Sequence, residues 1–398
     1  MSVPFSTGFS RKANLDEAIE EAFGKALERL EGEPALILSY LSYSKYPEPE
    51  KVEDALRKVA GGAPFIGVST AGEYVNDLAL NGSVVMALLS NKYFKAAVGS
   101  SEGAQSRPRD AGVSAARRAL AALESVPSAN PLKPPVVALL HSAPGREEDV
   151  LRGVREVLGR HVAVVGGSSG DDFKLKAPLG YQVSSDGSGV GRVALVLIAS
   201  KLDYEVLGGH PCTPTSAFGL ATRVSGARNE VLEEIDGEPA LSKYASWLGL
   251  SEGEVRENIL ALGLSNPLGV RDPVTGEYFV KHPAMTVGES GIGCFATIPA
   301  KHVVHMLRND RERAVRLGAG LLNGIKGKPV GALLIHCAGL AAYLGNERAS
   351  FVRKISESLG GAPLAGLAAY GEQWGYEASG TQAVHNNLTM AMLVFTAH

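Results

Sequence analysis

Three short segments of this 398-residue chain place a glycine next to a carboxylate. Their residue types and spacing make them the best candidates in the sequence for binding or catalysis. They are Gly72-Glu73, Gly170-Asp171 and Gly371-Glu372. Glycine allows a positive φ and lets the backbone approach a ligand closely. Either these turns bind a small molecule, or the glycines only form the turn and the acids cap nearby backbone groups. None fits the GxxxxGK[ST] pattern, so we do not predict a phosphate-binding loop.

Polar residues also end three apolar runs that have the character of buried strands. The pairs are Ser39-Tyr40, His141-Ser142 and His336-Cys337. Such residues either line one pocket, or several related pockets, or are satisfied by the loops that follow. Both interpretations stay open at this point.

Cys337 invites a nucleophile interpretation because His336 precedes it. A catalytic thiol needs a base within hydrogen-bond reach and a lowered pKa. Adjacent strand residues point to opposite faces, so His336 is a poor base for Cys337. His385 could reach either residue, but a buried structural thiol is favoured. The other nucleophile candidates are hydroxyls, on Ser69, Thr70, Ser168 and Ser169.

The segment from Tyr370 to Tyr376 has the composition most typical of a ligand pocket, since it joins aromatic rings, a carboxylate and glycines. The alternative is that Trp374 and Tyr376 only cover an interface. His302 and His305 are flanked by residues that favour a strand, on which they face opposite sides. We therefore predict no metal site and no cofactor.

Composition narrows the function classes. The net charge is −3 and hydrophobic residues make up 45% of the chain, as in a globular protein. No basic stripe suggests nucleic acid, and no apolar run is long enough for a membrane helix. The three cysteines lie far apart, so they fit neither a disulfide framework nor a zinc site and favour a cytoplasmic protein. Only four glutamines occur, which is one trend of thermophiles.

The elements that position these residues are repeated along the chain. Residues 62–73 and 361–372 are identical at six of twelve positions, and 162–172 is a weaker third copy. Each copy is predicted to contain a helix, a strand, a second helix, a short strand and a β-rich tail. The predicted first helices are 14–31, 110–125 and 310–325; first strands 35–40, 136–141 and 331–336; second helices 49–60, 147–159 and 346–359; and tails 83–97, 191–206 and 383–396.

These units predict an α/β fold. Each strand–helix–strand part is a parallel crossover, whereas the tails resemble antiparallel strands, so we expect mixed sheets flanked by helices. Residues 207–305 break the pattern, with two predicted helices (238–249 and 252–262) and a predicted hairpin of 294–298 with 302–307. The predicted modules are 1–212, holding units 14–100 and 108–206, and 213–398, holding the divergent segment 213–307 and the third unit, 310–396.

The pattern resembles the FIST family, with its N-terminal and C-terminal modules. The resemblance to the first module lies in residues 67–73 and 165–171. The resemblance to the second lies in residues 231–241, 336–339, 363–372 and 385–389. The resemblance implies a sensory module that binds small, amino-acid-like molecules, here without an attached signalling domain. An arginine expected after the Cys-Ala-Gly segment is Leu340, and another is replaced near Lys281-His282-Pro283. This departure predicts a different or less acidic ligand.

We therefore predict a small-molecule sensor. The alternatives are a hydrolase using one of the nucleophiles above, or an interaction scaffold, with a homodimer or a signalling protein as possible partner. The predicted ligand-binding residues are His336, Cys337, Gly339, Tyr370, Gly371, Glu372, Trp374, His385 and Asn386. The secondary candidates are Ser69, Thr70, Gly72, Glu73, His141, Gly166, Gly167 and Asp171.

Overall fold

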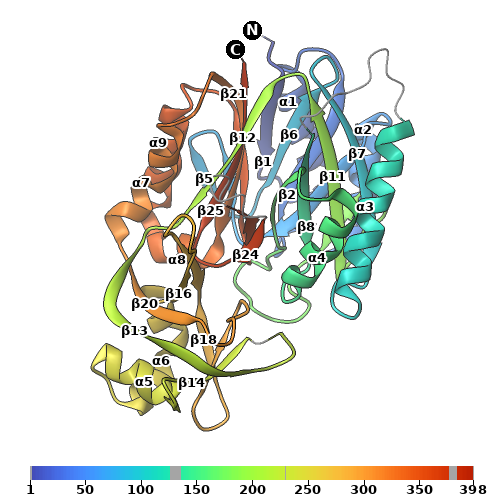
Figure 1. The fold of residues 1–398 in the computed structure, drawn as a ribbon. Coiled ribbons are helices and arrows are strands. Elements are labelled where there is room, and N and C mark those ends of the chain that lie inside the picture. The colour runs from blue at the N-terminus through green and yellow to red at the C-terminus, as the bar shows by residue number, and fades with distance from the viewer. Residues whose placement is uncertain (1, 126–135, 229, 376–382, 398) are drawn as a thin grey trace.

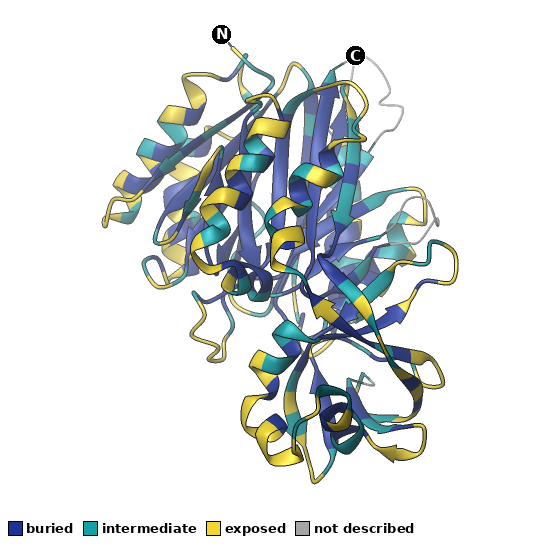
Figure 2. Ribbon diagram, turned by 90° about the vertical axis from the view of Figure 1, so that its left-hand side faces the viewer, coloured by how far each residue is buried: buried dark blue, intermediate teal, exposed yellow. Residues whose placement is uncertain are grey.

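The computed structural model describes residues 2–125, 136–228, 230–375 and 383–397. It confirms the predicted mixed α/β class. Three sheets flanked by helices form the body, and a fourth sheet with two helices forms a lobe at one end (Figure 1). The strands of the body are buried, and its helices turn their exposed faces outward (Figure 2).

The first sheet comes mostly from the first repeat unit and has the order β1-β6-β2-β3-β10. Its parallel strands β2 and β3 are joined by helix α2, as predicted for a crossover. Its strands and covering helices are β1 (Phe5–Ser10), α1 (Leu15–Leu27), β2 (Pro34–Ser42), α2 (Pro49–Ala60), β3 (Phe65–Thr70), β6 (Val84–Ser90) and β10 (Gln182–Ser184).

The second and third sheets repeat this plan, with orders β24-β23-β9-β8-β11-β7 and β12-β25-β21-β22-β4-β5. The second sheet and its helices are β7 (Phe94–Glu102), α3 (Pro108–Ser125), β8 (Val136–Ser142), α4 (Glu147–Leu158), β9 (Ala163–Gly167), β11 (Arg192–Ser200), β23 (Glu372–Trp374) and β24 (Val384–Asn386). The third comprises β4 (Glu73–Val75), β5 (Leu78–Leu80), β12 (Asp203–Gly209), α7 (Arg311–Leu322), β21 (Lys328–Cys337), α8 (Ala338–Leu344), η1 (Gly345–Glu347), α9 (Arg348–Ser358), β22 (Leu364–Ala369) and β25 (Met390–Ala397).

The three units exchange short strands in a cyclic order. The β4-β5 hairpin of the first unit joins the third sheet, β10 of the second joins the first sheet, and β23-β24 of the third joins the second. The next strand of the chain crosses as well, since β7 pairs with β11 and β12 pairs with β25. The first sheet of the body therefore contains strands from two units, and the second and third sheets each contain strands from all three. The inner faces of all three sheets meet in one apolar core that includes Phe5, Tyr40, Val196, Leu367 and Trp374.

Helices α3 and α4 pack with their backbones in direct contact. A Cβ atom at Gly112 would lie 2.3 Å from the Val150 carbonyl oxygen, and one at Gly153 would lie 2.0 Å from that of Arg109. Only glycine fits at either position, so the contact fixes how α4 sits on the second sheet. The face of α4 that points toward the lobe then becomes available for a site.

The lobe is formed by the divergent segment. Its elements are β13 (Cys212–Ser225), β14 (Val231–Ile235), β15 (Glu238–Pro239), α5 (Ala240–Leu248), α6 (Glu252–Ser265), β16 (Leu268–Arg271), β17 (Tyr278–Lys281), β18 (Pro283–Val287), β19 (Gly291–Cys294) and β20 (Val303–Asn309). The two predicted helices are present. The predicted hairpin of 294–298 with 302–307 is wrong, because β19 pairs with β14 and β18, whereas β20 pairs with β13 and β16.

Candidate functional site in the cleft between body and lobe

The three glycine-carboxylate turns come together at the carboxyl ends of the strands. Ala71 N–H donates to the Ala368 carbonyl, and Ala368 N–H donates to that of Gly72. Gly170 N–H donates to the Ser69 carbonyl, and Ser168 N–H to that of Gly371. The repeated turns thus form a hydrogen-bonded ring in the interior.

Two of the carboxylates in this ring make matching internal contacts. Glu73 accepts hydrogen bonds from Thr70 and from both the backbone N–H and the hydroxyl of Ser83. Glu372 accepts from the N–H and hydroxyl of Thr389. Burial raises the pKa of Glu73 to about 7 and raises that of Glu372 well above its usual value. Both side chains are fully buried, and each ties a turn to the residue just before a long strand, β6 for Glu73 and β25 for Glu372.

Asp171 departs from this pattern. It accepts hydrogen bonds from the backbone N–H groups of Leu175 and Lys176 and from the Tyr370 hydroxyl. The contact with Tyr370 places two predicted site residues together. Ser69 holds the same region through a 2.8 Å hydrogen bond to the Gly170 carbonyl.

The predicted residues of the third unit are distributed around the core. His336 stacks on Phe351 and bonds the Tyr74 hydroxyl, and its burial lowers its pKa to about 3. Gly339 lies in α8, where a Cβ atom would meet Leu388 at 2.9 Å. The remaining members form side-chain contacts inside the body: Trp374 donates to the Thr389 hydroxyl, Asn386 donates to the Trp374 carbonyl, and Gly371 (φ 114°) packs on the His385 ring. Tyr376 is outside the described residues.

The predicted residues of the second unit also have interior partners. His141 lies 2.9 Å from the Gly167 carbonyl, and burial lowers its pKa to about 4. Gly166 and Gly167 have no room for side chains, because a Cβ atom would lie 2.1 Å from the Leu140 carbonyl oxygen or 2.7 Å from Ile335. These residues are therefore part of the packed interior of the body.

The nucleophile candidates have no histidine as a hydrogen-bond partner among the described residues. The hydroxyls of Thr70 and Ser168 donate to Glu73 and Glu147, and that of Ser169 donates to the Leu179 carbonyl. Cys337 accepts from the Leu388 N–H, and burial raises its pKa. The geometry therefore gives no support to the hydrolase hypothesis.

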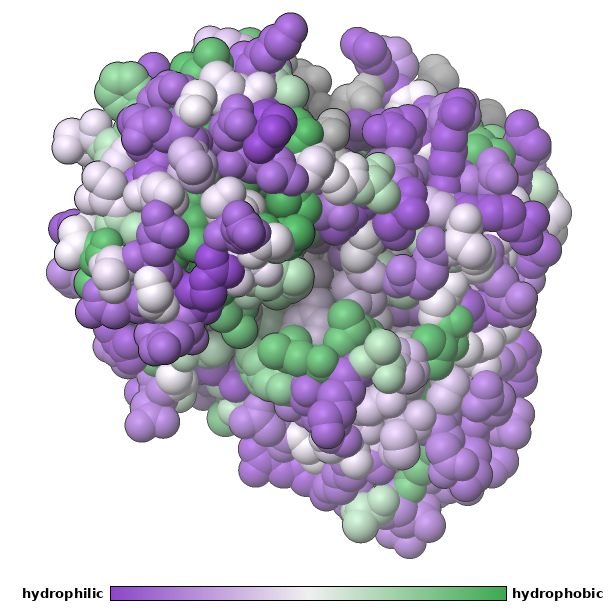
Figure 3. All heavy atoms as spheres, turned by 90° about the horizontal axis from the view of Figure 1, so that it is seen from below, coloured by the Kyte–Doolittle hydropathy of each residue, from purple (hydrophilic) through white to green (hydrophobic). Residues whose placement is uncertain are grey.

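A cavity of about 300 Å³ lies between the body and the lobe. Seen from the side of the lobe, the surface is hollowed between masses that carry both apolar and polar side chains (Figure 3). The cavity is lined from the body by Glu148, Leu151, Arg152, Arg155, Ala383, Val384 and His385, and from the lobe by Val270, Phe279, Lys281, Thr297 and Pro299.

Regular secondary structure positions most of this lining. The four residues from α4 are spaced i, i+3, i+4 and i+7, which puts them on one helix face. In the lobe, Phe279 and Lys281 alternate along β17 and share a face, and Val270 is paired with Phe279 on the neighbouring strand. The cavity is thus formed where a helix of the body meets a sheet of the lobe.

Cations dominate the charge of the cavity. Lys281 is only 7% exposed, and no described residue forms a hydrogen bond or ion pair with its ammonium group. The Nε and Nη2 atoms of Arg155 are also buried without a described partner, and burial lowers its pKa to about 10. Arg152 is more exposed and pairs with Asp149. Unpartnered buried donors are rare in native proteins, so these groups are candidates for binding an acceptor.

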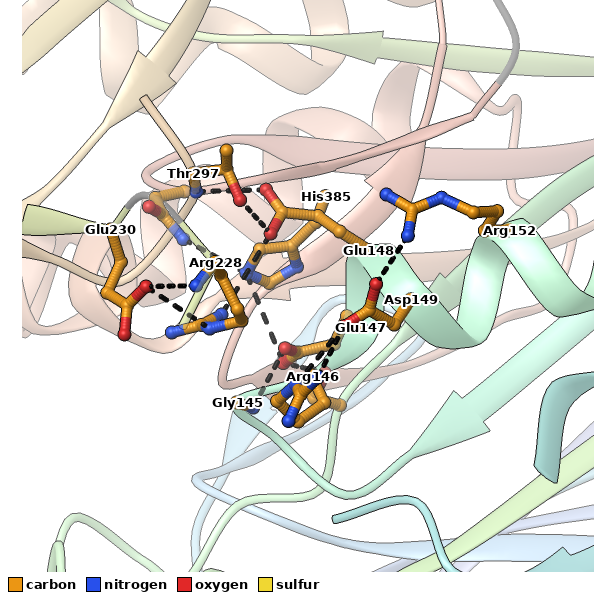
Figure 4. Close-up of polar contacts among 12 residues, drawn as sticks. Gly145, Arg146, Glu147, Glu148, Asp149, Arg152, Arg228, Glu230, Thr297 and His385 are labelled. Atoms are coloured by element: carbon orange, nitrogen blue, oxygen red, sulfur yellow. Dashed lines mark hydrogen bonds and ion pairs between the residues drawn. The ribbon is translucent and has the colours of Figure 1, made fainter. Parts of the chain in front are cut away.

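Glu148 is the carboxylate in the cavity wall, and it connects the two parts of the molecule. It accepts hydrogen bonds from the backbone N–H and the hydroxyl of Thr297, and Arg228 lies 3.9 Å away (Figure 4). Burial acts to raise its pKa, but nearby His385 and Lys281 and the Thr297 hydrogen bonds outweigh this, so the pKa is lowered. Glu148 is therefore an anion held between body and lobe.

His385 joins the cavity to the ring of turns. It lies between Glu147 and Glu148 (Figure 4), with Nε2 4.0 Å from Glu147 Oε1. Gln373 Nε2 contacts both His385 Nδ1, at 3.3 Å, and Ser168 Oγ, at 3.2 Å. Among the predicted ligand-binding residues in the described chain, His385 is the one that lines this cavity.

Comparison with known families identifies the relationship. The profile of the FIST N domain matches residues 35–238, and that of the FIST C domain matches residues 240–374. The chain belongs to the FIST family. FIST domains are sensory and signal-transduction modules. A search of curated proteins found no match to this chain.

Among solved structures, the FIST chain is similar to cyanuric acid hydrolase from A. caulinodans, with 10% identity and a TM-score of 0.26. The match covers 50% of this chain and 71% of the other. In the described part of the FIST chain, no helix is long and apolar enough to cross a membrane, and no group of three or more His, Cys, Asp or Glu residues is placed to hold a metal ion.

Sequence reasoning missed most of the cavity of this FIST protein. The sequence marks Lys281 only as a replacement for a family arginine, and 147–159 only as a helix. The signal available was the spacing of Glu148, Arg152 and Arg155, which places charges on a second face of a helix whose first face is apolar. The partner face on β16 and β17 could not be inferred, because it depends on how the lobe is oriented.

Proposed function

We propose that this FIST protein is a sensor that binds a small organic anion in the cavity between body and lobe. The observation that carries the proposal is a pair of cations, Lys281 and Arg155, that line one cavity. Lys281 is buried, as are the Nε and Nη2 atoms of Arg155, and these groups have no described hydrogen-bond partner. Burying a charge without a partner is costly, so a site of this kind is selected for a ligand that supplies the partner.

The rest of the lining supports an organic ligand. Phe279, Leu151 and Val384 offer apolar surface beside the cations. A largely apolar pocket with a few placed polar groups is the usual form of a small-molecule site. Its volume of about 300 Å³ suits a ligand of roughly amino-acid size.

The charge balance favours an anion over an amino-acid zwitterion. Three cations face one carboxylate, and both oxygens of Glu148 already accept hydrogen bonds from Thr297. The ammonium group of a zwitterion would thus add positive charge to a site that already has an excess of it. A carboxylate alone would compensate Lys281 and Arg155.

The position of the cavity supports a sensory role. A ligand there touches both parts of the molecule, so it changes the balance between more open and more closed arrangements, provided that it binds one of them better. The three cysteines are free and buried, which fits a reducing compartment such as the cytoplasm. A signalling protein that reads the arrangement of the lobe is the partner that this role requires.

The test compares three compounds that differ in charge but share a phenyl ring: 3-phenylpropanoate, phenylalanine and phenethylamine. Binding is measured by isothermal titration and by thermal shift. We expect 3-phenylpropanoate to bind best, and a ligand at a hundred times its Kd to stabilise the protein by about 2.7 kcal/mol. Arg155→Met should weaken its binding by about 10- to 100-fold, the worth of a charge-assisted hydrogen bond.

The matched control is Arg353→Met, which removes an exposed cation from α9, away from the cavity lining. It should leave binding unchanged. Tighter binding of phenylalanine or phenethylamine than of the anion, or equal binding to the Arg155→Met and parent proteins, would remove the basis of the proposal.

The lobe also supports an interaction role as the second candidate. Phe218 is 60% exposed and Met285 53% exposed, and Leu220 and Val303, which are paired across β13 and β20, are also exposed. Exposed apolar surface of this kind is typical of an association site. Sedimentation over a range of concentrations, with Phe218→Ser as the variant, tests whether this face mediates association.

A further inference from the structure

Lys281 has the position and surroundings of a reactive amine. We infer that Lys281 captures the carbonyl group of an oxo acid as a covalent iminium, while the acid's carboxylate is held by the arginines of α4. This inference rests on the proposed anion site and names the class of its ligand, a compound with both a carboxylate and a ketone or aldehyde. It goes beyond charge compensation, because it assigns a covalent bond to Lys281.

The geometry places the amine inside the cavity. Lys281 is the last residue of β17, and Phe279 precedes it on the same strand face, so the side chain lies beside an apolar ring and against the α4 face. It is 7% exposed and has no described hydrogen-bond or ion-pair partner, which leaves its nitrogen free for a ligand. A lysine with only a structural role would be expected to reach a carboxylate or solvent.

The environment also favours the neutral amine. Burial lowers the pKa of Lys281, and the opposing effects of Glu148 and Cys294 do not restore it. A lysine desolvated in an apolar pocket is the usual form of an amine that forms Schiff bases. Glu148 is close enough to interact with its charge and would stabilise the cationic product.

The reaction is balanced without any oxidant or cofactor. The amine nitrogen attacks the carbonyl carbon and forms a C–N bond, and the resulting carbinolamine loses water as its C–O bond breaks. Overall, the lysine ammonium and the carbonyl compound give an iminium ion and one water molecule. The positive charge is conserved, and hydrolysis reverses the step, so the capture is compatible with reversible sensing.

The experiment uses the full chain and two oxo acids, phenylpyruvate and 4-oxopentanoate. Each is incubated with the protein and sodium borohydride, which delivers hydride to the iminium carbon and fixes a secondary amine. Peptide mass spectrometry then locates the label. We expect saturable labelling at Lys281, at least tenfold above that of an exposed lysine such as Lys58, and none at this position in Lys281→Arg.

The outcomes separate this inference from the proposed function. 3-Phenylpropanoate is phenylpyruvate without the carbonyl, and it should bind both the parent protein and Lys281→Arg while competing with labelling of the parent. If it binds but neither oxo acid labels Lys281 above Lys58, the covalent inference is wrong and the anion site stands. If it does not bind and labelling follows exposure alone, both are wrong. Arg155→Met should retain labelling but require about 10- to 100-fold more probe, matching the expected loss of the arginine contact.

Discussion

The ring of turns and the interlobe cavity both contain buried ionisable side chains, but these side chains differ in whether they have hydrogen-bond partners. In the ring, Glu73 and Glu372 are fully buried, and each accepts a backbone N–H and a hydroxyl hydrogen bond from one residue, Ser83 or Thr389. In the cavity, the buried Lys281 and the buried Nε and Nη2 atoms of Arg155 have no described acceptor. The repeated residues therefore hold the fold together, whereas the residues of the proposed site are not repeated.

The lesson is that repetition marks packing in this molecule and that asymmetry marks the candidate site. A turn that occurs three times must satisfy the same contacts three times. The cavity arises once, where a face of α4 meets the divergent lobe. The four predictions that follow test this division, from the largest expected effect to the smallest.

Trp374→Ala should strongly destabilise the body. Trp374 is 1% exposed, and its ring fills the space in front of Gly208. Removing it leaves a large void and takes away the indole N–H that donates to the Thr389 hydroxyl, so the free energy of unfolding should fall by about 3–5 kcal/mol in denaturant titrations. Trp247→Ala, in the partly exposed α5, is the control and should cost markedly less. Equal losses would contradict the assignment of Trp374 to the core.

His141→Asn should reduce the slope of the free energy of unfolding against pH on the acid side. The pKa of His141 is lowered to about 4 in the folded protein, below the value of about 6.5 in the unfolded chain. The unfolded state therefore binds more protons between these values, so this contribution to stability is complete above pH 6.5 and lost as the pH falls toward 4. The slope is at most about 1.4 kcal/mol per pH unit. Asparagine keeps a donor toward Gly167, and an unchanged slope in unfolding measured from pH 4 to 7 would refute the prediction.

Thr297→Val should loosen the lobe without unfolding the body. It removes the hydroxyl that donates to Glu148 but keeps the backbone N–H bond. We expect a loss of about 1 kcal/mol, together with faster hydrogen exchange in the lobe next to the cavity. Thr213→Val, whose hydroxyl makes a long 3.4 Å contact with the Arg308 carbonyl, is the comparison and should change exchange little.

Arg155→Met should have the smallest effect on stability, in the opposite direction. It replaces a guanidinium whose buried donors are unpaired with an apolar chain of similar length. The free energy of unfolding without ligand should stay constant or rise by less than about 1 kcal/mol, because the desolvation cost of the charge is removed. A loss of more than about 1 kcal/mol would mean that Arg155 has a structural partner and would weaken the anion site.

Much of the body could be predicted from local patterns. The predicted helix 49–60 is α2 itself, where Pro49 opens the helix and Gly61, with φ 56°, follows its end. The predicted helix at 147–159 is α4 within one residue. These elements follow from apolar spacing and end signals that act within a few residues.

The parts that escaped prediction depend on distant segments. The failed hairpin shows this, because Phe295 N–H donates to the His282 carbonyl and not to the segment 302–307 that follows it in sequence. The exchange of β4-β5 into the third sheet has no local signature either. The cavity needs both kinds of information, since it depends on where the lobe places Lys281 against α4. The ligand-binding roles of the predicted residues stay predictions, with His385 best placed among them.

The cyclic exchange of strands also constrains how the protein can be made in a cell. The β4-β5 hairpin leaves the ribosome early, yet its partner β22 is synthesised almost 300 residues later. The last strand, β25, lies between β12 and β21 in the interior of its sheet. Nascent chains therefore carry unpaired strand edges until β25 has been synthesised, and the third sheet cannot be completed before then. A premature stop that removes β25 should yield a chain for degradation and not a shortened sensor.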